Sequence, residues 1–378
     1  MVEDFSAKKF GLGLPHSLND WLKVLCKRWT EPPLASFPHS AQGSRIFDAL
    51  LSLSHEIPLF PTMEATQEIY SAFRVPTMEH IITDIITLPQ DTLEVVDVAA
   101  DSIIPGLSKA AFIAAMIMSH SAEWTPSSRM YSIHSLPCQP SGTLQCQLKI
   151  PNTFKDRAIV ETDGRVPRWV SSVCPAGTLT NIHVDYHGSA QLMVNVTCDK
   201  LWLLWPPTES NLLWWNSRHT RVSHGDTVCD AIAQLEGLEL LHANGSQSFV
   251  LPPYHFHAVL TFEASAHLGV TLWGFPWWDT SRRGVEWEIQ WASNHSKNGF
   301  SSEMAEGVLN AIQDESLKYW TEVINRFPKH ELAETVKSWL ISMKANIQDV
   351  LAAIHASVET GKRKRSGRTE SSKKRRND

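Results

Sequence analysis

The sequence predicts an α+β protein in which an all-β core at residues 131–295 is flanked by helices on both sides. Within this core, short apolar stretches alternate with polar residues and are interrupted by Pro or Gly about every ten residues, which is typical of strands. Before and after it, apolar residues recur at steps of three or four, which is typical of helices. We therefore expect a mainly helical flank at 1–130, C-terminal helices at 300–358 and a basic tail at 359–378.

The N-terminal flank carries several helix signals. Ser17 and Ser44 each stand before an apolar stripe, as helix-capping residues do. No binding motif appears in this region, so we interpret it as a cover for the core rather than an independent domain. Further helices are expected at 64–73, 78–88 and 107–120, and a strand at 92–98.

The core begins where the hydrophobic period changes from that of a helix to that of a strand. Leu144–Ile150 alternates strictly between apolar and polar residues, as a half-buried strand should. Trp169–Val173 leads through Pro175–Gly177 into a further strand, and 268–273 closes the series. Short strands with frequent turn signals predict a closed or sandwiched all-β core.

The C-terminal region predicts two amphipathic helices. One covers Ser301–Phe327 and ends near Pro328. The other carries a long apolar stripe: Leu332, Val336, Leu340, Met343, Ile347, Val350, Leu351 and Ile354. This helical pair either packs on the core or forms a homodimer contact.

The last 18 residues differ sharply from the rest of the chain. They hold nine basic and two acidic residues, whereas residues 1–360 hold 25 basic and 38 acidic ones. A like-charged segment without apolar residues is expected to be disordered. The clusters Lys362–Arg365 and Lys373–Arg376 resemble a bipartite nuclear localisation signal read by the nuclear import machinery, although nucleic-acid phosphates or solubility could use the same charges.

Other features limit the class of protein. Six Cys without a C-x-x-C pair argue against a zinc finger and a disulfide framework. The first residues lack the apolar segment of a secretory signal. The longest apolar run, at 110–118, is too short to span a bilayer. We expect a soluble, intracellular protein without a membrane partner.

The stretch from Thr180 to Pro207 carries the candidate chemistry. His183 and Asp185 are two residues apart, so on a strand both side chains point to the same face. A second imidazole would complete the 2-His-1-carboxylate set, which leaves positions on Fe(II) open for other ligands. His257 is the preferred third ligand, although His255 could point the same way.

These residues resemble the JmjC family of iron- and 2-oxoglutarate-dependent oxygenases, a cupin-like family of histone demethylases and protein hydroxylases. His183-x-Asp185 is similar to its H-x-D motif, and Thr180 to a threonine that binds the co-substrate. Lys200-x-Trp202-x-Leu204-x-Pro206-Pro207 is similar to K-x-W-x-L-x-P-P. The family's later motif matches at Gly245, Phe249, Val250, Pro252, His257 and Val259, so the resemblance covers roughly 130–295.

The resemblance implies a double-stranded β-helix, or jelly roll, with Fe(II) held by His183, Asp185 and His257 as the catalytic centre. It further implies 2-oxoglutarate and O2 as co-substrates. Lys200 would bind the distal carboxylate of 2-oxoglutarate, and Thr180 would donate a hydroxyl hydrogen bond to it.

The resemblance also implies a nuclear dioxygenase that acts on a protein, with demethylation of N-methyl-lysine on a histone tail as the leading expectation. Alternatives are a protein side-chain hydroxylase and a catalytically silent chromatin interaction module. Some positions depart from the family: Leu192 and Met193 replace an Asn or Tyr, Cys198 a Gly, Ser246 an acid and Thr261 an Asn. Residues 211–245, with Trp214 and Trp215, are either a substrate-contacting roof or a packed loop.

Overall fold

The structure is a computed structural model of the 378-residue chain. It describes residues 58–64, 77–88, 95–97, 102–104, 108–119, 131–138, 148–163, 166–175, 178–185, 187–197, 199–218, 227–245, 247–262, 264–295 and 299–374. The helices expected after Ser17 and Ser44 lie outside these ranges, as does almost all of the helix expected at 64–73.

The chain divides into two compact units. Unit 1 comprises the residues up to Lys155 together with Val160–Asp185 and Ala190–Leu272. Unit 2 comprises two short segments, Asp156–Ile159 and Tyr186–Ser189, together with the chain from Trp273 onward. Almost all of the strands belong to unit 1, and unit 2 is mainly helical.

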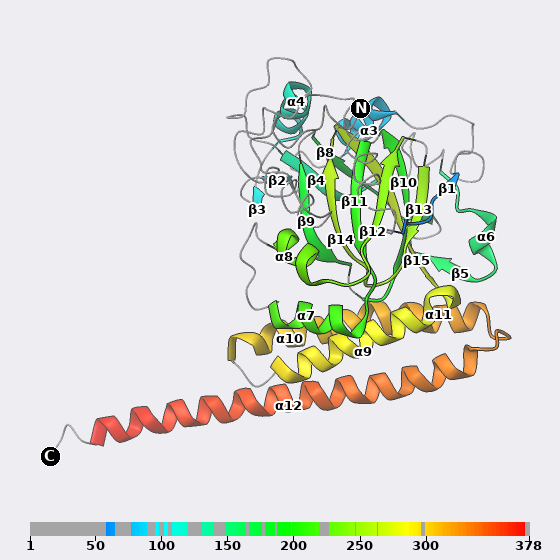
Figure 1. The fold of residues 1–378 in the computed structure, drawn as a ribbon. Helices are drawn as coiled ribbons and strands as arrows, with labels where there is room; N and C mark the ends of the chain where they lie inside the picture. Colours follow the sequence, from blue (N-terminus) through cyan, green and yellow to red (C-terminus); the bar gives the residue numbers. More distant parts are fainter. Residues whose placement is uncertain are drawn as a thin grey trace. The chain divides into compact units, whose positions relative to one another are not determined.

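Unit 1 is built on two antiparallel sheets (Figure 1). The larger sheet has the strand order β1-β13-β10-β15-β8-β4-β2-β3, and the smaller one has the order β12-β11-β14-β9. Their bounds are β1 Met63–Glu64, β2 Val95–Asp97, β3 Ser102–Ile104, β4 Tyr131–Pro137, β8 Trp169–Cys174, β9 Leu179–Val184, β10 Ala190–Thr197, β11 Asp199–Trp205, β12 Glu239–Asn244, β13 Gln247–Leu251, β14 Phe256–Thr261 and β15 Ser265–Gly274. The remaining short strands are β5 Ala158–Val160, β6 Thr162–Asp163 and β7 Val166–Pro167.

From β8 onward the chain moves back and forth between the two sheets. The strands β8, β10, β13 and β15 belong to the larger sheet, whereas β9, β11, β12 and β14 belong to the smaller one. Side chains from the inner faces of both sheets can therefore meet in one interior space.

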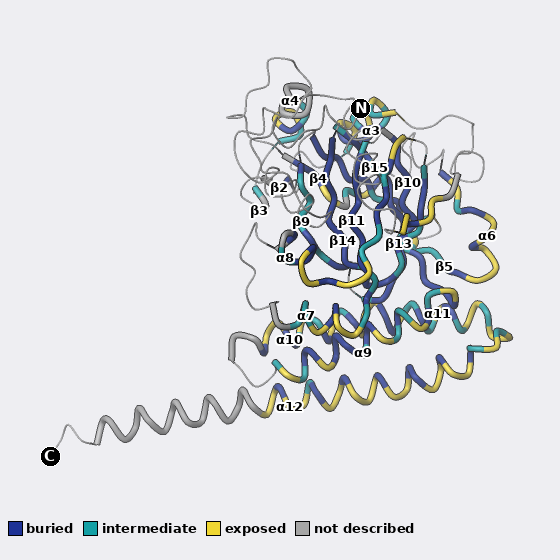
Figure 2. The backbone as a smooth tube through the Cα atoms, in the orientation of Figure 1, coloured by how far each residue is buried: buried dark blue, intermediate teal, exposed yellow. Residues whose placement is uncertain are grey.

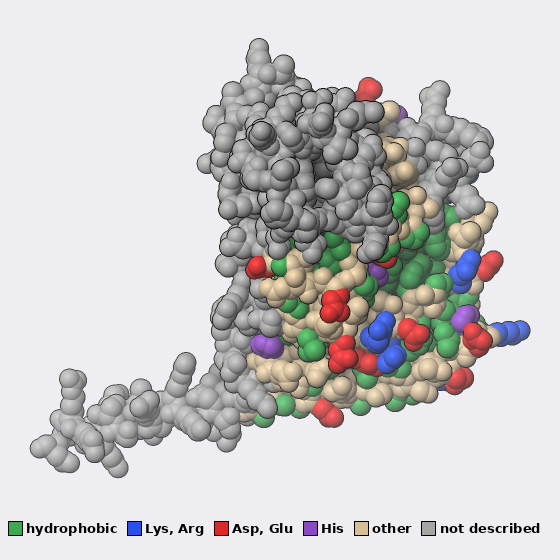
Figure 3. Space-filling model, viewed as in Figure 1, with side chains coloured by type: hydrophobic (Ala, Val, Ile, Leu, Met, Phe, Trp, Pro, Cys, Tyr) green, Lys and Arg blue, Asp and Glu red, His purple; other side chains and the backbone are tan. Residues whose placement is uncertain are grey.

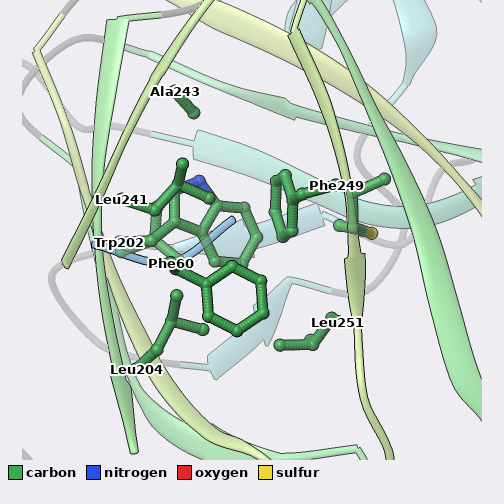
Figure 4. Packing of buried hydrophobic residues seen from close by; sticks show 9 residues of the cluster. Phe60, Trp202, Leu204, Leu241, Ala243, Phe249 and Leu251 are labelled. Atoms are coloured by element: carbon green, nitrogen blue, oxygen red, sulfur yellow. The ribbon is translucent and has the colours of Figure 1, made fainter. Parts of the chain in front are cut away.

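This interior is filled by a cluster of apolar side chains (Figure 4). Trp202 of β11 stands with its ring 5.1 Å from that of Phe249 on β13, and Phe60 lies 6.0 Å from Phe249, so both sheets contribute aromatic rings. Burial of each such side chain contributes roughly 1.5–3 kcal/mol. The full cluster is Phe60, Met193, Trp202, Leu204, Leu241, Ala243, Phe249, Leu251 and Val259.

A short N-terminal segment connects the edges of the two sheets. The backbone N–H of Phe60 donates to the carbonyl of Leu240 on β12, at 2.9 Å, and β1 pairs with β13. The segment thus satisfies backbone groups at the edge of each sheet while it inserts the Phe60 ring between them.

The helices of unit 1 include α3 Met78–Thr87, α4 Lys109–Ser119, α6 Asn152–Lys155, α7 Glu209–Arg218 and α8 Thr227–Gln234. The helices expected at 78–88 and 107–120 are confirmed by α3 and α4. At the start of α3, Thr77 and His80 form a reciprocal capping box, which satisfies free backbone N–H groups. Beside the smaller sheet, α8 contacts β9, and Trp215 of α7 lies 5.5 Å from Phe256 of β14.

The described part of the N-terminal flank contains strands that the sequence does not predict. The strand expected at 92–98 is present as β2, but β1 and β3 are further strands of the larger sheet. These strands are two or three residues long. Such short segments show no measurable period, so pairing with an existing sheet decides their structure.

Unit 2 contains α9 Trp278–His295, α10 Gly299–Ala311, the π-helical turn η5 Ile312–Leu317, α11 Lys318–Arg326 and α12 Ala333–Lys374, and the short 3-10 helix η4 Phe275–Trp277 precedes α9. The helix α9 was expected to be part of the β core. Its buried residues Trp278, Val285, Ile289 and Ala292 have helical spacing, so the signal is present in the sequence.

The apolar stripe of α12 is used within unit 2. Val336, Leu340, Met343, Ile347 and Ile354 are buried, and α12 contacts α9, α10 and α11. In Figure 2, buried positions recur along this helix between exposed ones. The stripe therefore carries no argument for a homodimer.

The basic tail also differs from expectation, because α12 continues as a helix through Lys374. The sequence predicts a disordered tail from 359. Lys, Arg and Glu favour helix, no Pro interrupts the segment, and the packed part of α12 provides the costly first turns. Within the described ranges, no helix is both long enough and apolar enough to cross a membrane.

Candidate metal centre

Three side chains of unit 1 form a group that could hold a metal ion. The ligand atoms of His183, Asp185 and His257 all lie within 4.8 Å of one another. His257 is buried, whereas His183 and Asp185 are half-buried, so the group is partly accessible to solvent. Two imidazoles and a carboxylate supply three ligands and leave further coordination positions free.

Strand pairing places these residues together. His183 on β9 lies directly opposite His257 on β14, and their rings are 4.0 Å apart. Asp185 follows β9 immediately, two residues after His183, and so extends the same face. The arrangement that the sequence predicts for this group is the one that the two strands produce.

The position of Thr180 depends on an irregularity that the sequence does not reveal. Thr180 and His183 are three residues apart, which on a regular strand would put them on opposite faces. The register shifts here, since Thr180 lies opposite Val259 while His183 lies opposite His257. The extra residue on β9 returns Thr180 to the inner face.

Backbone contacts fix how both imidazoles face the metal position. Nδ1 of His183 lies 2.9 Å from the carbonyl oxygen of Asn181, and Nδ1 of His257 lies 3.0 Å from that of His255. A carbonyl only accepts, so each Nδ1 carries the proton and each Nε2 keeps its lone pair free. Such contacts orient metal-binding imidazoles.

The electrostatic surroundings keep His257 neutral. Burial lowers the pKa of His257 to about 4, and the adjacent His183 adds to this while Asp185 opposes it. A neutral imidazole is the form that binds a metal. Near neutral pH, His257 therefore needs to lose no proton before it can act as a ligand.

His255, the alternative third ligand, faces elsewhere. Its ring lies 6.2 Å from Phe60, and it is not part of the group formed by His183, Asp185 and His257. Desolvation lowers its pKa to about 4 as well, so the pKa does not distinguish the two histidines. The geometry does, and it selects His257.

Trp202 connects the metal group to the deeper interior. Its ring is stacked with that of His257 at 5.7 Å and meets that of His267 edge-on at 5.8 Å. His267 in turn lies 3.0 Å from Nζ of Lys200. The indole thus separates a metal-binding end of the site from an end that carries a buried ammonium.

Lys200 is on the inner face of β11, two residues before Trp202, and only 1% of it is exposed. Thr180 is half-buried on β9, and its neighbour across the pair, Val259, is also the neighbour of Trp202. The two residues expected to bind the co-substrate therefore share the interior with the metal group.

Sequence reasoning missed His267, Asn195 and the environment of Thr261. Asn195 and His267 lie opposite each other on β10 and β15, and Thr261 lies opposite Lys200. A His within the strand 265–274 was a usable signal, since a polar side chain on an inner face needs a partner. Asn195 donates from Nδ2 to the carbonyl of Gln247, at 3.1 Å.

Two residues that depart from the family pattern, Leu192 and Met193, are part of the buried core. Met193 belongs to the apolar cluster beside Trp202, and Leu192 is fully buried. These two residues fill space and offer no hydrogen bond to a ligand. The expected roof at 211–245 contains most of α7 and all of α8, and Trp214 donates from Nε1 to Gln234, at 2.9 Å.

Compared with known proteins, the chain matches no protein-family model and no curated protein. The chemistry of the site therefore has to be argued from its residues.

Proposed function

We propose that the protein is an Fe(II)- and 2-oxoglutarate-dependent dioxygenase of the JmjC type. The observation that carries this proposal is the convergence of His183, Asp185 and His257, with both Nε2 lone pairs free, in the same interior as the buried Lys200. A set of two imidazoles and one carboxylate is suited to Fe(II), whereas an all-carboxylate set would suit Mg²⁺ or Ca²⁺.

The strand arrangement supports a double-stranded β-helix. Four strands of the larger sheet, β8, β10, β13 and β15, face four of the smaller one, β9, β11, β12 and β14. The chain changes sheet after every strand except β11, which is followed by β12 of the same sheet, in the manner of a jelly roll. In that architecture the inner faces of opposing strands converge on one site, as β9 and β14 do here.

The co-substrate fits the charge of the site. Lys200 is buried, and no acidic partner is recorded for it among the described residues. A buried ammonium without an anion is costly, so a ligand carboxylate would stabilise it. The carboxylate of 2-oxoglutarate that lies far from its keto group would have this role, with Thr180 as a hydroxyl donor.

When bound, iron with 2-oxoglutarate and O2 supplies the oxidation of an unreactive C–H bond, with succinate and CO2 as co-products. The protein's own residues do the rest. His183, Asp185 and His257 would hold the metal, Lys200 and Thr180 would hold the co-substrate, and Trp202 with the apolar cluster would exclude water from one side.

We propose a protein as the substrate, with methylated lysine on a histone tail as the leading candidate. Hydroxylation of an N-methyl group gives an unstable carbinolamine and releases formaldehyde, whereas hydroxylation of a side-chain carbon gives a stable alcohol. The body of the chain, with 25 basic and 38 acidic residues, would attract a basic tail. On the face in Figure 3, acidic and basic side chains are interspersed over the described residues, so this view offers no dominant patch.

Metal analysis and turnover test the enzyme class. Purified protein reconstituted with Fe(II) should retain the metal and convert 2-oxoglutarate to succinate, and His183→Ala should do neither. Iron retention without any turnover of 2-oxoglutarate would instead favour a catalytically silent interaction module.

Mass spectrometry tests the substrate class. Methylated histone peptides and nuclear extract are incubated with the iron-loaded enzyme. Loss of a methyl group with formaldehyde release would establish demethylation, and gain of one oxygen atom would establish stable hydroxylation. An active enzyme that changed neither sample would contradict the proposed protein substrate for the candidates tested.

A further inference from the structure

The buried end of the candidate site holds an ammonium whose recorded partner is a neutral group. Nζ of Lys200 lies 3.0 Å from Nδ1 of His267. An ammonium only donates hydrogen bonds, so this nitrogen of His267 accepts, and the imidazole is neutral with its proton on Nε2. The low pKa of His267 agrees with this, since burial and the charge of Lys200 both lower it well below its ordinary value.

The imidazole of His267 reaches Lys200 from the inner face of the larger sheet. His267 on β15 lies opposite Asn195 on β10 and is two residues from Gly269. A Cβ atom at Gly269 would lie 3.4 Å from Sδ of Met193, which belongs to the apolar cluster between the sheets. The face of β15 that carries His267 is therefore directed into the interior, across from Lys200 on β11.

Two buried hydroxyl groups lie on the same inner faces and lack a hydrogen-bond partner in the described structure. Thr261 is directly opposite Lys200 in the pairing of β14 with β11, and Ser265 precedes His267 by two residues on β15. Both residues are 0% exposed, and neither side-chain oxygen is satisfied. A buried hydroxyl without a partner costs about 1–3 kcal/mol, so a ligand that accepts from it is favoured.

We propose that His267 is a positioning residue for Lys200: it accepts one ammonium N–H and thereby directs the other two toward an anion whose carboxylate the hydroxyls of Thr261 and Ser265 also contact. This inference rests on the proposed function, in which that anion is 2-oxoglutarate. It adds three residues of this chain to the co-substrate end of the site. It also explains why Lys200 lies beside the neutral imidazole of His267. A buried ammonium is usually paired with a carboxylate of the protein, and here the ligand would supply that carboxylate.

His267 could act through its hydrogen-bond acceptor or through the shape of its ring, and two substitutions distinguish these two roles. His267→Asn keeps an acceptor near the position of Nδ1, since the amide oxygen of Asn can take the same hydrogen bond. His267→Leu keeps a similar volume but accepts nothing, so Lys200 would lose its fixed direction. His242→Leu is the matched control, because it removes an imidazole that contacts Asp199 on the opposite face of the smaller sheet.

The experiment measures 2-oxoglutarate binding by calorimetry on full-length protein loaded anaerobically with Fe(II), together with metal content and steady-state kinetics. His267→Leu is expected to weaken binding about tenfold or more, the effect of losing one hydrogen bond to a charged group, at unchanged iron content. KM for 2-oxoglutarate should rise by a similar factor with little change in kcat. His267→Asn and His242→Leu should stay within about threefold of wild type. Thr261→Val should weaken binding without any loss of iron.

Three outcomes would overturn the proposal. Wild-type affinity in His267→Leu at full iron content would remove the positioning role and leave the proposed function standing. Equal losses in His267→Asn and His267→Leu would show that ring shape matters, not the hydrogen bond. A wild-type protein that retained no iron and bound no 2-oxoglutarate would overturn both the proposed function and this inference.

Discussion

At the scale of single residues, the candidate metal centre depends on backbone carbonyls as much as on its three ligands. Each of the two histidines is held through Nδ1 by the carbonyl of the residue two positions before it. A strand that carries such a histidine therefore sets both its tautomer and its ring orientation without help from another side chain. This makes the centre local to β9 and β14, and it gives a sharp test of the ligand set.

The first prediction compares two histidines that differ by two positions. His257→Ala should reduce retained iron to less than roughly one tenth, because two remaining ligands hold a labile divalent ion poorly. His255→Ala should leave iron content close to wild type, since its ring faces Phe60. Elemental analysis of the two purified variants measures the iron content. Loss of iron in His255→Ala but not in His257→Ala would show that His255, not His257, is the third ligand.

The second prediction concerns the buried charge. Lys200→Met should raise KM for 2-oxoglutarate about tenfold or more, since the ligand carboxylate loses its cation. The free protein should be no less stable, because the substitution removes an ammonium that is buried without an acid. Thermal unfolding and steady-state kinetics on one preparation test both parts. A large loss of stability with unchanged KM would mean that Lys200 is structural.

At the scale of elements, the segment Tyr186–Ser189 is fixed by hydrogen bonds to other residues of unit 2. The backbone N–H of His187 donates to Oε1 of the buried Glu288, at 2.9 Å, and Ser316 of the π-helical turn donates to the carbonyl of His187. His187 and Gly188 have φ angles of 70° and 81°, in the left-handed region. Two successive left-handed residues reverse the chain, and the buried partners of His187 stabilise that conformation.

The third prediction compares two glycines of unit 2. A Cβ atom at Gly188 would lie 2.5 Å from Oγ of Ser281, which accepts a hydrogen bond from Trp320 and so cannot move freely. Together with the left-handed φ, Gly188→Ala should cost about 2 kcal/mol or more. Gly307→Ala on α10 has open space and should stabilise by about 0.5–1 kcal/mol. Denaturant unfolding of the metal-free variants measures both. Equal stabilities would contradict the close approach.

Sequence patterns predict the elements of this chain unevenly, and the reasons are physical. The strands β8 and β15 were identified from apolar segments bounded by turn signals, and the stripe of α12 was identified because it repeats a helical period over many residues. Most of the alternating strand expected at 144–150 lies outside the described residues. The bulge in β9 was not, since a single extra residue leaves no periodic signal, although it decides which face Thr180 occupies. The residues of β1 and β3 adopt strands only because a sheet is present to pair with them.

In the candidate site too, residues with a local sequence pattern could be predicted, whereas contacts between distant residues could not. His183, Asp185 and His257 could be predicted, since their spacing carries the ligand chemistry and a resemblance sets their register. The presence of His267 in a strand was a signal that it needs a partner, but its sequence position does not identify that partner as Lys200, 67 positions away. The contact joins β15 of the larger sheet to β11 of the smaller one, so it forms only when the inner faces of the two sheets meet.

At the scale of the whole molecule, the last prediction separates the packed body from the basic tail. The last buried residue recorded for α12 is Ile354, so a chain that ends at Thr360 keeps the helix stripe that packs on α9–α11. Removing 361–378 takes away nine basic residues and no large apolar one, so the free energy of unfolding should change by less than about 0.5 kcal/mol.

The nuclear accumulation that we propose for the full-length protein, in contrast, should be lost. Alanine substitution of Lys362–Arg365 and Lys373–Arg376 removes the eight charges that import receptors would bind, while helix formers stay in place. Imaging of the tagged full-length protein, the truncated chain and a variant with only one cluster replaced provides the comparison, with iron content as the control for an intact site. Persistent nuclear accumulation of the truncated chain would rule out the tail as the localisation signal. A protein that left the nucleus only when both clusters were replaced would show that either cluster is sufficient.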